Sequence, residues 1–171
     1  MQDVDRAAAT GNDHSGPGEA LRMDASPSWP RALRSYIVAS LLLHLAWEIV
    51  QLPLYTIYWS QPVSQQVFAI LHCTAGDVMI ASLSLLLALA IVGTPDWPVD
   101  CDSRVWLATM VLGVAYTIFS EWFNVSIRGT WAYSEFMPTL PIVGTGLGPL
   151  LQWFVIPTSA LWICKQRHPW A

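Results

Sequence analysis

Five ionisable side chains lie within stretches of the sequence that are otherwise apolar. In chain order they are His44, Glu48, His72, Asp77 and Glu121. A charged side chain at the centre of a bilayer costs at least about 2.5 kcal/mol on insertion scales, so a membrane helix seldom carries one without a use. Carboxyl groups and an imidazole held away from water are suited to general acid and base catalysis. These residues therefore indicate a site built inside the apolar part of the protein.

The composition favours a membrane protein. Of the 171 residues, 54% are hydrophobic and 12% are charged, whereas about a quarter of the residues in a soluble domain are charged. The 10 Trp also fit, because indole rings collect at the boundary between lipid and water. A formal net charge of −4 without a basic patch argues against a nucleic-acid-binding protein.

Four stretches are long enough to cross about 30 Å of hydrocarbon as helices. They cover about residues 33–55, 67–92, 104–124 and 147–164. We therefore predict an all-α, polytopic membrane protein, with a four-transmembrane-helix bundle over residues 33–164. Residues 1–32 are rich in Ala, Gly, Asp, Ser and Pro and are expected to form a disordered cytoplasmic tail, and residues 165–171 a second, short one.

The basic residues predict the orientation of the spans. Five of them flank the spans on one side: Arg31, Arg34, Arg104, Lys165 and Arg167. The loop at 57–66, on the other side, has no Lys or Arg. Because cytoplasmic loops carry the excess of positive charge, both termini are expected in the cytoplasm. The short, compact design is typical of a multi-pass protein of a bacterial inner membrane.

The polar residues are expected to meet at similar depths. With a rise of about 1.5 Å per residue, His44 and Asp77 fall near the midplane and Glu48 lies about 6 Å further out. Gln152 falls one to two turns into the fourth span. All of these positions are in the outer half of the bilayer, and the cytoplasmic half is expected to be plain Leu, Ala, Val and Ile.

Helical spacing predicts which side chains share a face. His44, Glu48 and Gln51 follow one another at i, i+4 and i+7 and form a single stripe. His72 and Asp77 are five residues apart, about 140° around a helix. They cannot both point straight into the bundle, so one of them is expected to face a neighbouring helix or the outer vestibule.

The third span and the loop after it carry the remaining polar and aromatic candidates. Glu121, Asn124 and Arg128 repeat the i, i+3, i+7 spacing if the helix continues slightly past the membrane, and Arg128 is the natural salt-bridge partner of Glu121. The loop at 125–146 is so apolar, with Trp131 and Tyr133 among its residues, that we expect it to lie as a lid over the mouth of the bundle.

The residues expected to form the site fall into two groups. Those assigned to catalysis are His44, Glu48, Asp77 and Glu121. Those assigned to substrate binding are Trp47, Gln51, Asn124, Trp131, Tyr133, Gln152 and Trp153.

This arrangement is similar to that of the four-helix emopamil-binding-protein (EXPERA) superfamily, whose best-known enzyme isomerises a sterol double bond. The likeness consists of His44-x-x-x-Glu48 in the first helix, a carboxylate in the second, a late acid in the third, and an amide beside Trp in the fourth. It implies that His44, Glu48 and Asp77 stand at the positions of the catalytic His and acids. Gln152 and Trp153 would stand where that family has an Asn and a Trp. The sequence departs from the pattern in two ways: Asp replaces the Glu of the second helix, and Gln152 directly precedes Trp153 rather than being separated from it by two residues.

The chemistry so implied is proton transfer on a lipid or isoprenoid. A protonated Glu48 or Asp77 would donate a proton to an alkene, and His44 would hold the acid in place and reset its protonation. The resulting carbocation would be stabilised by the ring faces of Trp47 or Trp153 and by the other, ionised carboxylate.

Two other classes of function remain open. His44, Glu48, His72 and Asp77 are a donor set suited to zinc in a membrane hydrolase, or, through the two histidines alone, to a bis-His haem. The second class is non-enzymatic, a transporter subunit or a protein that stabilises a membrane partner. Four helices make a thin wall for a transport path, so this function would require a homo-oligomer.

Overall fold

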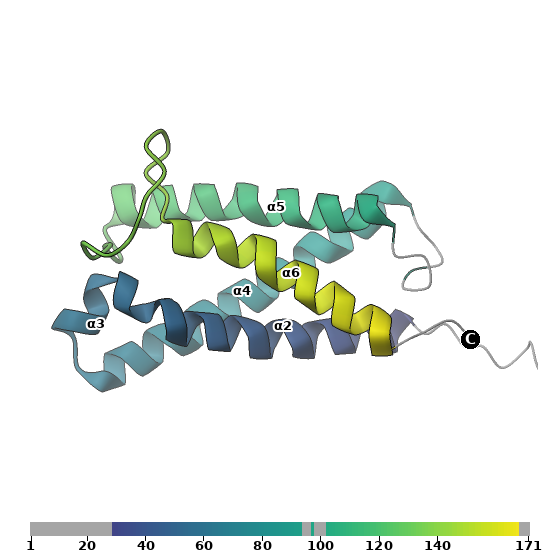
Figure 1. The fold of residues 1–171 in the computed structure, drawn as a ribbon, viewed down its shortest axis with the longest axis horizontal. Helices are drawn as coiled ribbons and strands as arrows, with labels where there is room; N and C mark the ends of the chain where they lie inside the picture. The colour runs from purple at the N-terminus through teal and green to yellow at the C-terminus, as the bar shows by residue number, and fades with distance from the viewer. Residues whose placement is uncertain (1–28, 94–96, 98–101, 168–171) are drawn as a thin grey trace, which may run out of the picture.

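Four long helices form the protein. The computed structural model describes residues 29–93, 97 and 102–167, and Figure 1 shows its fold. The long helices are α2 (Trp29–Gln51), α4 (Val63–Val92), α5 (Ser103–Glu121) and α6 (Leu147–Arg167). Each of the four, with the short helical turns that continue α2 and α5, is long and apolar enough to cross a membrane. The predicted all-α architecture with four candidate spans is therefore confirmed.

Short helical segments extend the ends of these helices. A 3-10 turn (Leu52–Leu54) follows α2, and α3 (Thr56–Ser60) leads towards α4. A π-helical segment (Trp122–Arg128) extends α5 as far as Gly129, whose φ of 60° ends it. The third helix is thus longer than predicted, and the loop begins after residue 128 rather than at 125. At the other boundary, α2 already starts at Trp29, so residues 29–32 of the predicted tail are helical, while residues 1–28 and 168–171 lie outside the described part.

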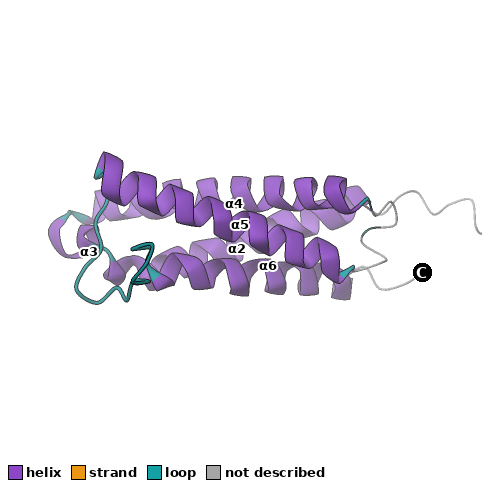
Figure 2. Ribbon diagram, turned by 90° about the horizontal axis from the view of Figure 1, so that it is seen from above, coloured by secondary structure: helices purple, strands orange, loops and turns teal. Residues whose placement is uncertain are grey.

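The helices pack in a ring in which each long helix has two neighbours. α2 packs against α4 and α6, and α5 packs against the same two helices. In Figure 1, α6 runs diagonally from beside α5 at its start to beside α2 at its end. Figure 2, turned by 90°, shows that the loops drawn in teal gather mainly at the end of the bundle where α3 lies.

Small side chains allow the helices to approach closely. The fully buried core contains Ala32, Ala81, Ala88 and Ala160, none of which is exposed at all. Small residues at helix contacts are typical of membrane proteins, where lipid provides no hydrophobic drive for association. Large apolar side chains, in contrast, point away from the bundle and are exposed along its length, for example Leu42, Leu83 and Ile91.

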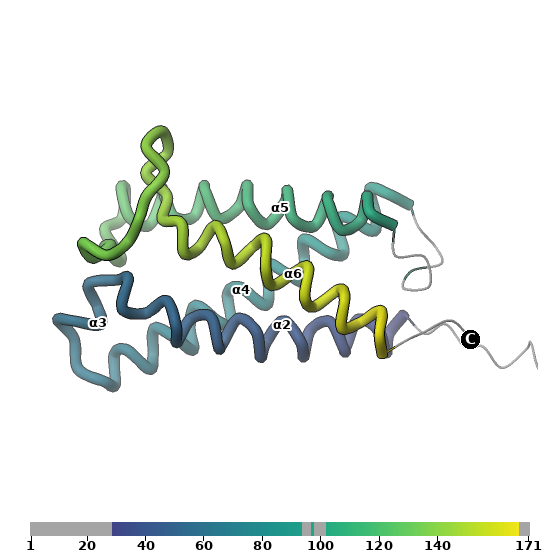
Figure 3. Tube along the Cα trace, viewed as in Figure 1, coloured from purple at the N-terminus to yellow at the C-terminus, as the bar shows by residue number. Residues whose placement is uncertain are grey.

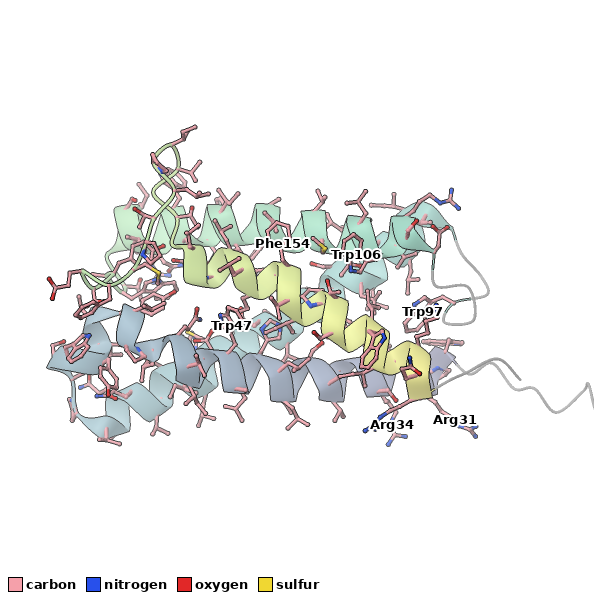
Figure 4. The ribbon with its side chains drawn as sticks, viewed as in Figure 1. Arg31, Arg34, Trp47, Trp97, Trp106 and Phe154 are labelled. Atoms are coloured by element: carbon pink, nitrogen blue, oxygen red, sulfur yellow. The ribbon has the colours of Figure 1, made fainter. Side chains whose placement is uncertain are left out.

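The start of α2 and the end of α6 lie at the same end of the bundle, opposite α3 (Figure 3). Figure 4 places Arg31, Arg34 and Trp97 at this end. α5 also begins here, capped by Asp102, whose Oδ1 accepts a hydrogen bond of 2.8 Å from the backbone N–H of Arg104. Hydrogen bonds from Arg104 lower the pKa of the Asp102 carboxyl. The structure thus places the five basic residues that flank the spans at one end, while Arg128 lies beyond the other end of α5. That this end faces the cytoplasm stays a prediction.

Candidate acid/base site

A buried amide on α6 joins side chains of α2 and α4 inside the bundle. Gln152 Nε2 donates a hydrogen bond of 2.7 Å to Asp77 Oδ2 and lies 2.6 Å from His44 Nδ1. His44 Nδ1 is itself 3.5 Å from Asp77 Oδ2. Because an amide nitrogen only donates, a hydrogen bond from Gln152 to His44 Nδ1 puts the proton of a neutral imidazole on Nε2. The three side chains therefore form one polar cluster in which the tautomer of His44 is set by Gln152.

Glu48 enters this cluster from the next turn of α2. Gln51 Nε2 donates to Glu48 Oε1 at 2.6 Å and reaches Gln152 Oε1 at 3.4 Å. Trp47 Nε1 donates to Gln51 Oε1 at 3.1 Å. Glu48 also interacts with the Asp77 carboxyl. Two interacting carboxyl groups in an apolar interior are the arrangement in which general acid and general base roles separate.

The Trp153 indole packs against the polar cluster on one side and against a glycine on the other. Its ring centroid lies 5.7 Å from that of His44, at an angle of 57°. On the other side it packs against Gly113 of α5, where an added Cβ would come within 2.0 Å of Trp153 Cε3. Only glycine leaves room for the indole at this position. Gly113 was not among the residues expected to form the site, although a glycine in a helix interior is itself a signal of close packing.

A second carboxyl group, on α5, is bonded to the loop that precedes α6. The Tyr133 hydroxyl donates to Glu121 Oε2, and it accepts a hydrogen bond of 3.0 Å from the backbone N–H of Gly146. The indole of Trp131 also interacts with the Glu121 carboxyl. Burial, together with the hydrogen bond to Glu121 and its charge, raises the pKa of Tyr133 above its ordinary range. The tyrosine is therefore a firm hydrogen-bond donor to Glu121.

The same loop is fastened to the turn after α2 by backbone hydrogen bonds. Thr56 N donates to Ala132 O at 2.9 Å, and Ser134 N donates to Leu54 O at 2.9 Å. The two segments meet at an antiparallel bridge between Tyr55 and Tyr133. The expected lid is thus a loop whose first half is tied to the α3 end of the bundle.

Tyr55 interacts electrostatically with carboxyls of both groups, Glu121 and Glu48. Burial raises its pKa well above the ordinary range, and the charges of Glu121 and Glu48 both add to the effect. Glu121 in turn interacts with Asp77. All four residues predicted to be catalytic, His44, Glu48, Asp77 and Glu121, therefore lie in one region of the bundle.

One expectation for the end of α5 was wrong. Glu121 is not paired with Arg128, because Tyr133 takes its carboxyl and the Arg128 guanidinium lies 5.9 Å from the centroid of the Phe123 ring. The physical reason is the π-helical turn, which has more residues per turn than an α-helix and rotates Arg128 off the expected stripe. The Asn124 amide donates to Ser120 O at 2.9 Å, and its assignment to substrate binding stays a prediction.

His72 does not join the other candidates. Its ring is exposed and stacks on Phe68 of the same helix, with centroids 5.7 Å apart and planes at 16°. Asp77 is therefore the one of the pair that faces inward. Within residues 29–93, 97 and 102–167, no group of three or more His, Cys, Asp or Glu side chains is placed to hold a metal ion. The four-residue zinc set and the bis-His haem both require His72 beside His44, which this geometry does not provide.

The half of the bundle nearer to Arg31 is more polar than predicted. Tyr36 and Ser40 are fully buried on α2, and Thr109 is fully buried on α5. Ser40 Oγ in this half and His44 Nε2 at its border are buried without a hydrogen bond of good geometry to any described residue. An unpaired buried polar group costs about 1–3 kcal/mol, so these atoms need an explanation. Nothing in the sequence marks this region, because tyrosine and serine are ordinary residues in an apolar helix.

No protein-family model matches the chain, and neither a curated protein nor a solved structure is significantly similar to it.

Proposed function

We propose that this chain is a multi-pass membrane enzyme that transfers protons on a lipid or isoprenoid substrate, in the manner of a double-bond isomerase. The observation that carries the proposal is the group of His44, Glu48, Asp77 and Gln152, brought together from three helices inside an apolar bundle. The similarity of these residues to the EXPERA pattern supports the same assignment. The positive charges at one end of the bundle support an N-in, C-in orientation in the inner membrane.

Asp77 is the carboxyl assigned to meet the substrate. Its side chain keeps 19% of its surface accessible, whereas His44 beside it has none. Glu48, at 7%, is nearly enclosed. Asp77 can therefore reach a bound molecule, while Glu48 and His44 interact with Asp77 from the interior of the bundle.

The reaction moves a double bond without net consumption of protons. The protonated carboxyl gives its proton to one alkene carbon, and a new C–H bond forms while the other alkene carbon becomes cationic. A carboxylate then removes a proton from the carbon next to the cation, and the double bond forms one position along. The ring face of Trp47 or Trp153 stabilises the intermediate charge, and Gln152 holds Asp77 in place through the bond of 2.7 Å.

The proposal is tested by measuring the transfer of deuterium from solvent to lipid. Purified protein is incubated in D2O with membrane lipid extract and with a panel of isoprenoid alkenes, and deuterium in each lipid is measured by mass spectrometry. We expect incorporation with the wild type and a loss of at least about 100-fold in Asp77→Asn, in line with the usual contribution of a general acid or base. His72→Gln, a change on the outer face of the same helix, is expected to behave as the wild type.

Two results would reject the proposal. One is a wild type that incorporates no deuterium into any lipid, which would favour a non-enzymatic function. The other is incorporation by Asp77→Asn at the rate of the wild type, which would remove the carboxyl from the mechanism.

A further inference from the structure

A line of buried polar side chains runs along α2 from the carboxyl groups towards the Arg31 end. Tyr36, Ser40, His44 and Glu48 follow at intervals of four residues, and their exposed fractions are 0%, 0%, 0% and 7%. Each step is about 6 Å along the axis, so the line covers about 18 Å. It continues the polar cluster into the half of the bundle where no function has been assigned.

The polar atoms along this line are present but incompletely bonded. His44 Nε2 and Ser40 Oγ are both buried without a hydrogen bond of good geometry to any described residue. Side chains on a helix lean towards its N-terminus, so the His44 ring extends over the turn that carries Ser40. Two such groups one turn apart are the partners that a single water molecule bridges in protein interiors.

The next step of the line ends at Tyr36. Its hydroxyl lies near that of Ser40 and makes a long hydrogen bond of 3.4 Å to the Ala81 carbonyl of α4. From α6, Cys164 faces the same region, with its Sγ 3.4 Å from Ala32 O. Every group on the line can both accept and release a proton or a hydrogen bond.

We propose that Tyr36, Ser40 and His44 form a proton-exchange path from the Asp77–Glu48 carboxyl groups towards the Arg31 end of the bundle. This goes beyond the proposed enzymatic function, because it concerns the exchange of protons without a substrate. Once the Gln152 amide releases His44 Nδ1, protonated Asp77, 3.5 Å away, gives its proton to that atom, and His44 Nε2 releases its own proton towards Ser40. The imidazole gains one proton and loses one, and the same steps in reverse carry a proton inward.

Packing or hydrogen bonds close the bundle at both ends. At the α3 end the loop is held by backbone hydrogen bonds of 2.9 Å from Thr56 to Ala132 and from Ser134 to Leu54. The Tyr133 hydroxyl is in addition bonded to Glu121. At the Arg31 end the closure is apolar packing around Tyr36, and the polar line on α2 runs up to it.

Infrared spectroscopy of the protonated carboxyl groups tests the path. The C=O band of a buried carboxylic acid shifts when its proton is replaced by deuterium, and the band of Asp77 is identified by its loss in Asp77→Asn. After transfer of detergent-solubilised protein into D2O, the rate of this shift is compared in wild type, Ser40→Ala and Tyr36→Phe. Ser84→Ala, which removes a buried hydroxyl from α4 rather than from α2, is the matched control.

We expect exchange to slow at least about tenfold in Ser40→Ala and in Tyr36→Phe and to stay unchanged in Ser84→Ala. The unfolding temperature of each variant is measured beside the exchange rate: a purely structural loss would lower the unfolding temperature and speed exchange rather than slow it, and this separates the path from a structural role. Equal rates in all four proteins would overturn the proposal and assign exchange to the loop end. Because no substrate is present, the result stands whether or not the protein is an isomerase.

Discussion

Replacing Gln152 by Met is the sharpest test of the polar cluster. Methionine has nearly the length of glutamine but no amide, so the change removes hydrogen bonds with little change in volume. The substitution deletes the amide nitrogen that lies 2.7 Å from Asp77 Oδ2 and 2.6 Å from His44 Nδ1. It also deletes the carbonyl oxygen that accepts the weaker bond of 3.4 Å from Gln51.

The loss of stability expected for Gln152→Met has a lower and an upper bound. Hydrogen bonds between helices of membrane proteins average about 0.6 kcal/mol, so two good bonds give a lower bound of about 1 kcal/mol. Leaving two buried groups unpaired would cost about 2–6 kcal/mol at 1–3 kcal/mol each. His44 and Asp77 are already 3.5 Å apart and can close on one another, which recovers part of this cost. We therefore expect a loss of about 1–4 kcal/mol.

The assay is unfolding of the purified protein in detergent, with Gln65→Met as the control, because Gln65 is exposed at the start of α4. The wild type and Gln65→Met should unfold together, and Gln152→Met should unfold earlier. If Gln152→Met were as stable as the control, the amide would not join the three helices, and its place at the centre of the site would be refuted.

Two further changes have expected outcomes of known direction. Gly113→Ala should destabilise the bundle by about 1–3 kcal/mol, because the new methyl group overpacks against Trp153. The control is Gly76→Ala, which has nothing within 4 Å of the new Cβ and should be neutral or stabilise by up to about 1 kcal/mol. Equal unfolding temperatures of the two variants would contradict the packing argument. Tyr133→Phe should raise amide hydrogen exchange in the loop, because it removes the bond to Glu121. The pKa of Tyr133 is raised, so the loop amides of the wild type should stay protected from exchange below about pH 10, the ordinary pKa of tyrosine. They should lose this protection as the pH rises through the raised pKa. Loss of protection in mildly alkaline buffer would contradict this prediction.

The four helices and the stripe on α2 could be predicted because both depend on local sequence alone. Apolar length defines a span, and i, i+4, i+7 spacing places His44, Glu48 and Gln51 on one face whatever the partners are. The spacing of His72 and Asp77 also excluded both from pointing inward. Which of the two faces the bundle depends on the rotation of α4 against its neighbours, and that is a tertiary property.

The errors arose where the backbone leaves the regular α-helix or where a partner is distant in sequence. The π-helical turn after Glu121 cannot be inferred from helical spacing, so Arg128 was wrongly paired with Glu121. The partner of Glu121 is Tyr133, twelve residues further along, and reaches it only because the loop turns back over the bundle. A nearby opposite charge is a reasonable expectation from sequence, but the path of the loop decides the pairing.

The acidic side chains in the interior give the strongest support for the proposed proton transfer. Asp77 interacts with both Glu48 and Glu121 inside the bundle, and the imidazole of His44 lies 3.5 Å from Asp77. Three ionised carboxylates cannot be balanced by one imidazolium in an apolar interior. The proposed function accounts for this excess of acids, and any change in the charge of the cluster requires a route for a proton to enter or leave. A purely structural role would explain the hydrogen bonds of Gln152, but it would not explain why three acidic side chains occupy an interior where neutral side chains would cost less free energy.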